Sequence, residues 1–330
     1  MQVIPIFFAS NDNYIPLVSV MIRSIMENTV NSEETLKYEI IILHRGISWE
    51  IIEKFREMSA EFPRFSINFH EMLFENSNFF ISRNITVEAY FRLFIPFRFP
   101  QYEKALYFDG DMVCQSDVSE LFNTDISNYL IASVRDVAVA WYFLPEKKKD
   151  SKHHKIYEYM LSMKKPYNYI NSGMLLINCE MYRQTFSEKY ISDTILSREW
   201  QIYDQDVINF LAEDKILYLD YKWDFMPLWE WAQYLPQNLK NEYIEAQKSP
   251  KIIHFKPHLH WWYVPYSPFF WKYAARTPFF KCIVDKMDKD GLLNEEPVSK
   301  MWAMVRVRMG WKAILKTLIL ERLPCFLRRP

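Results

Sequence analysis

With 330 residues, of which 50% are hydrophobic, the chain can bury the core of one large domain or two ordinary ones, which excludes a disordered or fibrous protein. Its formal net charge of −1 is unevenly spread, because residues 301–330 carry +6 and the remaining residues −7. Its five glycines cannot form a P-loop or a Gly-x-Gly-x-x-Gly dinucleotide fingerprint, so a bound phosphate would have to be held by metal and side chains.

The sequence carries no sign of export or of a membrane span. Four widely spaced cysteines predict a reducing compartment and argue against a zinc site built on paired thiolates. The apolar run at residues 3–9 has no basic residue ahead of it, so we expect a first strand here and not a signal peptide. No run of about 18 apolar residues occurs, and we expect no membrane-spanning helix.

Strand and helix patterns alternate along the first seventy residues. We expect strands at 3–9, 38–44 and 65–70 and helices at 16–26 and 48–58. This alternation predicts an α/β fold with a mainly parallel central sheet flanked by helices. Ligands of such sheets bind at the carboxyl ends of the strands, where the polar segment 11–13 follows the first strand.

An apolar run at residues 105–108 ends in two carboxylates, Asp109 and Asp111. On an extended chain, residues two apart point to the same face. Such carboxylates repel each other unless a proton or a cation lies between them, and Mg²⁺ or Mn²⁺ prefers oxygen ligands of this kind. The competing interpretation, which the triplet alone favours, is a solvated turn after a strand.

The elements around this acidic strand carry further polar groups. A helix expected at 85–96 holds Arg92, which is either a surface residue or reaches an anion. A short helix at 117–122 and a strand at 129–134 follow, the strand ending near Asp136. The polar stretch 146–165 is interpreted as a mobile loop or an excursion of the chain over the site, with His153 and His154 as solvated residues and not metal ligands.

Later polar residues also lie next to apolar elements. Asn171 and Ser172 directly precede a buried strand, which is followed by a helix expected at 181–198. Asp204 and Gln205 open an apolar helix, where capping could explain the aspartate. Strands are expected at 216–219 and 251–255, with His254 near the end of the second.

Residues 301–330 differ from the rest of the chain. In a helical arrangement, an apolar face with Trp311 opposes a basic stripe formed by Arg308, Lys312 and Lys316. A basic amphipathic helix of this kind indicates an interfacial anchor on an anionic membrane surface. The alternative is a helix docked on its own domain or on a partner protein.

Six segments that occur in a fixed order identify a protein family more specifically than the acidic pair alone. The chain resembles glycosyltransferase family 8, the retaining GT-A group that includes bacterial lipooligosaccharide galactosyl- and glucosyltransferases. The segments span residues 3 to about 262 and are Phe8-Ala9-Ser10-Asn11-Asp12-Asn13-Tyr14, Tyr90-Phe91-Arg92, Leu106-Tyr107-Phe108-Asp109-Gly110-Asp111, Asn171-Ser172-Gly173-Met174-Leu175-Leu176-Ile177-Asn178, Asp204-Gln205-Asp206 and Ile253-His254-Phe255.

The resemblance implies a GT-A fold and a site for a UDP-sugar, UDP-galactose or UDP-glucose. Asp109, Asp111 and His254 would bind Mn²⁺ (or Mg²⁺), which stabilises the charge that develops on the leaving UDP. Gln205, on the opposite face of the anomeric carbon, and Asp204, where the family holds the donor sugar and phosphates, would be the catalytic residues. The substrate-binding positions would be Ala9, Asn11, Asp12, Asn13, Tyr14, Arg92, Asp109, Gly110, Asp136, Asn171, Ser172, Asp204, Gln205, Lys256 and His260.

Retention of configuration is the step that these residues explain least directly. Glycosidases that retain configuration use a carboxylate nucleophile, whereas Gln205 is a neutral amide. We therefore prefer attack on the same face, with the leaving phosphate oxygen helping to deprotonate the acceptor and Gln205 stabilising the oxocarbenium character.

The chain departs from the family after its metal histidine. The family pattern there is a glycine followed by Lys-Pro-Trp, in which the lysine contacts the diphosphate. Here His254 is followed by Phe255, the lysine comes early as Lys256, and His260 takes the usual lysine spacing. Either Lys256 or His260 would contact phosphate, and a histidine would make binding depend more on pH.

Two other functions are open to a chain with this acidic pair. A haloacid-dehalogenase-type phosphatase would use Asp109 as nucleophile and Asp111 as acid/base, although that motif normally lies near the N-terminus. The second alternative function is that of a non-catalytic glycan-binding protein with the same fold.

The preferred prediction is a hexosyltransferase with a GT-A catalytic domain at 1–275 and a C-terminal helical, basic extension at 276–330. It would be cytoplasmic, peripheral on the inner face of the plasma membrane, and would act in surface polysaccharide or lipopolysaccharide biosynthesis. Its expected partners are a saccharide or lipid-linked glycan acceptor and, through residues 301–330, an anionic membrane surface. No nucleic acid is expected.

Overall fold

The computed structural model describes residues 2–29, 36–74, 79, 86–144, 154–163, 165–255 and 266–289. Lys256, His260 and the basic segment 301–330 lie outside these residues, so their proposed roles stay predictions. Among the helices described, none has both the length and the apolar character that crossing a bilayer requires.

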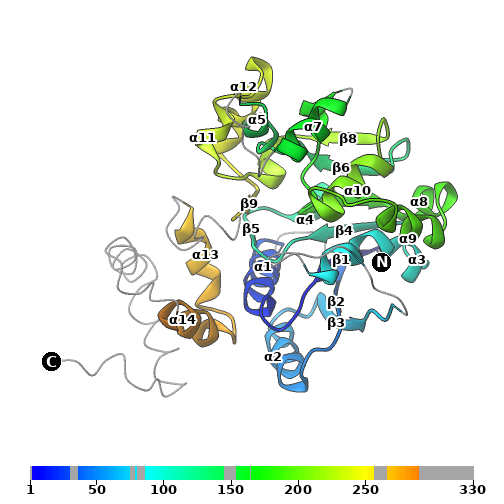
Figure 1. Cartoon of the computed structure of the whole chain (residues 1–330). Coiled ribbons are helices and arrows are strands. Elements are labelled where there is room, and N and C mark those ends of the chain that lie inside the picture. The colour runs from blue at the N-terminus through cyan, green and yellow to red at the C-terminus, as the bar shows by residue number, and fades with distance from the viewer. Residues whose placement is uncertain are drawn as a thin grey trace.

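A seven-stranded sheet forms the centre of the molecule, in the order β3-β2-β1-β4-β7-β6-β8 (Figure 1). All neighbouring strands are parallel except β7, which runs antiparallel to both β4 and β6. The expected mainly parallel α/β sheet is thus confirmed. The strands are β1 (Gln2–Ala9), β2 (Leu36–His44), β3 (Phe65–Glu71), β4 (Lys104–Phe108), β6 (Ile131–Val134), β7 (Met174–Asn178) and β8 (Ile216–Leu219).

A second sheet pairs β5 (Met112–Cys114) with β9 (Ile252–His254) in antiparallel register. Met112 lies opposite His254 in this ladder, so the chain just after the acidic pair meets a strand about 140 residues later. This pairing places His254 beside Asp109 and Asp111.

Helices and 3₁₀ turns cover both faces of the main sheet, because successive strand residues point to opposite sides. Phe8 belongs to the core under α1 and α2, whereas its neighbour Phe7 packs with η1 residues. The helical elements are α1 (Ile15–Asn28), α2 (Trp49–Ala60), η1 (Val87–Phe94), α3 (Ile95–Arg98), α4 (Val118–Phe122), α5 (Val139–Tyr142), α7 (His154–Ser162), η2 (Pro166–Asn168), α8 (Cys179–Thr185), α9 (Glu188–Leu196), α10 (Tyr203–Leu211), η3 (Tyr221–Asp224), α11 (Trp229–Ala232), α12 (Gln237–Lys248), α13 (Ser267–Ala274) and α14 (Phe280–Lys289).

Three sequence-based expectations are wrong in detail. The stretch 146–165, expected as a loop, contains helix α7, whose partly buried Ile156 and Tyr159 pack on Val139 and Tyr169. The helix expected at 181–198 is two helices, because Ser187 caps α9 by accepting from the backbone N–H of Tyr190. The helix expected at 85–96 is mostly the 3₁₀ turn η1.

The two last helices described, α13 and α14, lie alongside α1 (Figure 1). Arg276 pairs with Glu27 of α1 at 2.5 Å, and the rings of Phe279 and Phe55 lie 5.1 Å apart. Residues 276–289 therefore pack on the same core as the sheet. The division at residue 275 between a catalytic domain and an extension stays a prediction.

Candidate active site

A cavity of about 610 Å³ opens at the carboxyl ends of β1, β4 and β6. Thirteen of the residues predicted for the site line it, whereas Asp12 and Asn13 are exposed and do not. The lining residues among those predicted are Ala9, Asn11, Tyr14, Arg92, Asp109, Gly110, Asp111, Asp136, Asn171, Ser172, Asp204, Gln205 and His254.

Asp109, Asp111 and His254 form one group, here called the acidic cluster. One ligand atom from each lies within 4.8 Å of the others. Two carboxylates and one imidazole at this spacing suit a cation such as Mn²⁺, which accepts both oxygen and nitrogen ligands. The residues present therefore fit the metal that the resemblance implies.

Gly173 leaves room for the acidic cluster. A Cβ at this position would lie 2.6 Å from Cε1 of His254 and 2.9 Å from Oδ2 of Asp109. Neither atom belongs to a long flexible side chain, so any larger residue here would push the cluster apart.

Arg92 holds Asp109 from one side. Its guanidinium donates to Oδ1 of Asp109 at 2.9 Å and to the carbonyl of Ser172 at 2.6 Å, and the hydroxyl of Tyr107 donates to the same Oδ1 at 3.1 Å. Both donors bind Oδ1, which leaves Oδ2 of Asp109 directed at the space beside Gly173 and His254. The position of Arg92, 5% exposed, excludes the surface role that the sequence left open.

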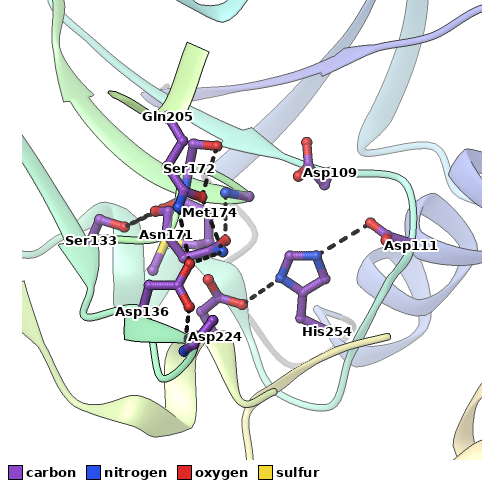
Figure 2. Close-up of polar contacts among 12 residues, drawn as sticks. Asp109, Asp111, Ser133, Asp136, Asn171, Ser172, Met174, Gln205, Asp224 and His254 are labelled. Atoms are coloured by element: carbon purple, nitrogen blue, oxygen red, sulfur yellow. Dashed lines mark hydrogen bonds and ion pairs between the residues drawn. The ribbon is translucent and has the colours of Figure 1, made fainter. Parts of the chain in front are cut away.

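His254 lies between two carboxylates, as Figure 2 shows. Its Nε2 is 3.4 Å from Oδ1 of Asp111 and its Nδ1 is 2.9 Å from Oδ1 of Asp224. Burial alone lowers the pKa of His254, but the carboxylates of Asp111 and Asp224 outweigh it, and the pKa lies well above its usual range.

A second group, here called the amide cluster, consists of Asp136, Asn171, Ser172 and Gln205 (Figure 2). The side-chain amide of Gln205 donates to Oδ2 of Asp136 at 2.9 Å, and its Oε1 accepts from the backbone N–H of Ser172 at 3.1 Å. The amide of Asn171 lies 3.2 Å from both Oδ2 of Asp136 and Oε1 of Gln205. These bonds fix the amide orientation of Gln205 at the cavity wall.

The start of α10 places Asp204 and Gln205 at the cavity. Tyr203 has a left-handed backbone with φ of 50°, a conformation that non-glycine residues seldom adopt. Asp206 holds this turn, since its carboxylate accepts from the hydroxyl of Tyr169 at 2.6 Å and from the backbone N–H of Ile202 at 2.7 Å. The bond that anchors the helix start is therefore made by Asp206 and not by Asp204.

Asp204 is buried beside Arg92, with 3.3 Å between Oδ2 and Nε. Burial raises the pKa of Asp204 to about 6, although the charge of Arg92 works in the opposite direction. A carboxyl with this pKa titrates near neutral pH, as is common among groups that take part in binding or chemistry.

Several residues of the site have no counterpart in the sequence-based prediction. Tyr107, Tyr142 and Trp231 line the cavity, and Asp224 contacts His254 from behind. Tyr107 could have been found from the alternation of β4, since residues 107 and 109 point to the same side. No spacing signal marks Asp224, because η3 reaches His254 only through tertiary packing.

Comparison with known proteins adds to this geometry. The family model described as glycosyl transferase family 8 matches residues 5–263. General stress protein A of Bacillus subtilis is 25% identical over 274 residues, which are 77% of this chain and 85% of that protein. The lipopolysaccharide glucosyltransferase WaaO of Escherichia coli is 29% identical over 211 residues, 60% of this chain and 57% of that one.

A solved structure of the galactosyltransferase LgtC in complex with donor and acceptor sugar analogues has the same fold. It superposes with a TM-score of 0.65 at 20% identity and covers 83% of this chain and 96% of that one. Some relatives are longer, and the chain spans 64% and 32% of two further curated relatives.

Proposed function

Because the chain belongs to glycosyltransferase family 8, whose model matches most of its length, we propose that it is a retaining, Mn²⁺-dependent hexosyltransferase that takes galactose or glucose from a UDP-sugar. The observation that carries this proposal is the placement of the acidic cluster and the amide cluster on one cavity. Transfer of a sugar from a nucleotide diphosphate is helped by positive charge at the leaving group and by fixed hydrogen-bonding groups around the sugar.

The acidic cluster would receive the diphosphate end of the donor. Asp109, Asp111 and His254 would hold Mn²⁺ (or Mg²⁺), which supplies positive charge where the departing UDP becomes negative. Arg92 stays bound to Asp109 and so keeps Oδ2 of this residue directed at the ion position. Asn11 and Tyr14, which follow β1, would contact the nucleotide.

The amide cluster would receive the sugar. Asp136 and Asn171 offer hydrogen-bonding atoms for sugar hydroxyls, and their mutual bonds hold them in place before the donor arrives. Gln205 is an amide and a poor nucleophile, so we propose that the acceptor hydroxyl attacks the anomeric carbon on the face that the phosphate leaves. The bond from this carbon to the phosphate oxygen breaks, and the leaving phosphate takes the proton of the acceptor hydroxyl. The carbonyl oxygen of Gln205 would then stabilise positive charge on the anomeric carbon.

The acceptor would be a hydroxyl of a saccharide or lipid-linked glycan in surface polysaccharide or lipopolysaccharide synthesis. The curated relative WaaO is a lipopolysaccharide glucosyltransferase, which supports this class of acceptor. Lys256 and His260 stay candidates for diphosphate contact.

Residues 301–330 would hold this enzyme on the inner face of the plasma membrane. Their net charge of +6 suits an anionic lipid surface. Removing 301–330 from the full chain should release the protein from phosphatidylglycerol vesicles and leave hydrolysis of the soluble donor unchanged. Equal vesicle binding by the full and shortened chains would contradict the anchor.

The direct test of the function is release of UDP from a panel of UDP-sugars, with and without Mn²⁺. We expect hydrolysis of UDP-galactose or UDP-glucose that needs Mn²⁺ and accelerates with a saccharide acceptor. The product anomer, read by NMR, should keep the donor configuration. Cleavage of a phosphomonoester in place of UDP release, or no Mn²⁺-dependent turnover of any donor, would contradict the proposal.

A further inference from the structure

Asp224 lies behind the acidic cluster and does not line the cavity. It has no exposed surface, and its Oδ1 lies 2.9 Å from Nδ1 of His254. Its second oxygen, Oδ2, has no hydrogen-bond partner within the described part of the chain. His254 is therefore the polar contact that the structure gives this carboxylate.

The backbone holds the two residues in register. Phe225, which follows Asp224, donates its N–H to the carbonyl of Ile252 at 2.9 Å, and the N–H of His254 donates back to the carbonyl of Phe225 at 3.0 Å. Turn η3 is thus tied to β9 on both sides of the pair. The approach of Asp224 to the ring is fixed by main-chain bonds and does not depend on a mobile side chain.

A buried pair of this kind contributes little to folding on general grounds. Removing a carboxylate from water costs several kcal/mol, and the attraction of one partner offsets that cost only when the remaining lone pairs are also satisfied. Those of Oδ2 are not. An apolar residue of similar size would fill the same space without the desolvation cost.

The carboxylate of Asp224 can determine which ring nitrogen of His254 carries hydrogen. In a neutral imidazole one nitrogen carries the proton and the other accepts. In the neutral ring that a bound cation requires, a carboxylate at Nδ1 selects the form with hydrogen on Nδ1, so that Nε2 keeps its lone pair for the ion. Nε2 is the atom that faces Asp111, at 3.4 Å from its Oδ1.

We propose that Asp224 is a positioning residue for the cation site: it accepts the Nδ1–H of His254, fixes the plane of the ring and presents a bare Nε2 to the ion between Asp109 and Asp111. The inference rests on the proposed metal site, which it deepens by naming the group behind one ligand. Metal-binding histidines commonly donate their second N–H to a carboxylate in this way, and losing that partner weakens metal affinity about 10–100-fold.

The test is Mn²⁺ affinity, measured on the full-length protein by electron paramagnetic resonance of the free ion without donor. Asp224→Asn keeps the size of the side chain, but its amide can turn its NH₂ toward Nδ1 and so favour hydrogen on Nε2. Asp224→Ala removes both the acceptor and the unpartnered oxygen. Asp220→Asn is the matched control, since Asp220 caps η3 and is exposed.

We expect Kd for Mn²⁺ to rise about tenfold in Asp224→Asn and up to about 100-fold in Asp224→Ala, and to stay unchanged in Asp220→Asn. Saturating Mn²⁺ should restore most of the turnover of both Asp224 variants. Either Asp224 variant, shown to be folded by circular dichroism, is sufficient for the measurement. A Kd within twofold of the parent in a folded Asp224 variant would overturn the proposal.

Asp109→Asn separates this failure from failure of the metal site itself. If the parent binds Mn²⁺ and Asp109→Asn does not, the metal site stands and the Asp224 variants alone decide the inference. If Asp109→Asn binds Mn²⁺ as tightly as the parent, the proposed metal site is wrong and the inference is lost with it.

Discussion

The acidic cluster and the amide cluster share one cavity but are built in opposite ways. In the amide cluster, Gln205 and Asn171 bind each other and Asp136, so donors meet acceptors. In the acidic cluster, Asp109 and Asp111 are brought together with an imidazole held between carboxylates. The amide cluster satisfies its own donors and acceptors, and the acidic cluster brings carboxylates together around an imidazole.

This difference indicates two ways of preparing a site. The amide cluster is preorganised by its own hydrogen bonds and needs no added group to keep its shape. The acidic cluster gains most from a cation, because neighbouring carboxylates repel until positive charge lies between them. A change in the acidic cluster should therefore alter metal affinity. A change in the amide cluster should alter turnover while metal affinity stays constant.

The largest effect is expected from Asp111→Asn. The change removes one charged ligand, so Mn²⁺ affinity should fall and UDP release at fixed Mn²⁺ should drop by about 1,000-fold, equivalent to about 4 kcal/mol of transition-state stabilisation. Chelation of the parent with EDTA should give the same loss. Turnover that survives either treatment would show that the acidic cluster does not serve a cation.

Gln205→Ala should lower kcat by about 100-fold while Kd for Mn²⁺ stays as in the parent. Among the described residues, the side chain of Gln205 bonds to Asp136, Asn171 and Ser172 and to no member of the acidic cluster. The measurement pairs steady-state kinetics with a Mn²⁺ titration. A parallel loss of Mn²⁺ affinity would show that the two clusters act as one unit, and unchanged kcat would remove Gln205 from the reaction.

Gly173→Ala sharpens the comparison at the point where the clusters meet. The added Cβ would lie 2.6 Å from Cε1 of His254 and 2.9 Å from Oδ1 of Asn171. Both clusters should therefore move, with Mn²⁺ affinity weakened about tenfold and kcat lowered in proportion. If Gly173→Ala changes only Mn²⁺ affinity, the added Cβ displaces His254. If it changes only kcat, the added Cβ displaces Asn171.

The last prediction concerns stability, and here the variant is expected to be more stable than the parent. The pKa of Asp204 is about 6 in the fold against an ordinary 3.8, so the folded state holds this proton more tightly and stability falls as pH rises through that interval. Asp204→Asn should therefore raise the free energy of unfolding at pH 7 by up to about 3 kcal/mol and leave it unchanged below the ordinary pKa.

The measurement is urea unfolding of the parent and of Asp204→Asn, at pH 7 and at a pH below the ordinary aspartate pKa of 3.8. Equal stability at pH 7, or a variant less stable there, would show that the pairing of Asp204 with Arg92 outweighs the cost of burying the carboxyl.

Sequence reasoning predicted the parts of this molecule that depend on local pattern. Strand β1 and helix α1 follow from alternation and helical spacing, and the carboxyl ends of the parallel strands place Asn11 and Asp109 at one edge. The family resemblance, and not a local pattern, predicts that His254 lies beside Asp109. The pairing of β5 with β9 brings these residues together, and no local sequence pattern predicts that pairing.

What escaped prediction depends on packing between distant segments. Asp224 lies in a short 3₁₀ turn that carries no motif, and its contact with His254 forms where η3 meets β9. Helix α7 was missed because its polar and charged residues obscure the partly buried side that packs near Tyr169.

The antiparallel pairing of β5 with β9 has a thermodynamic consequence for the whole chain. Two ligands of the acidic cluster precede β5 and the third ends β9, so a bound ion would join segments about 140 residues apart. An ion that binds only the folded form, at 100 times its Kd, adds about 2.7 kcal/mol to folding. The same cation would thus stabilise the folded chain, and its concentration would set how readily the pairing of β5 with β9 opens.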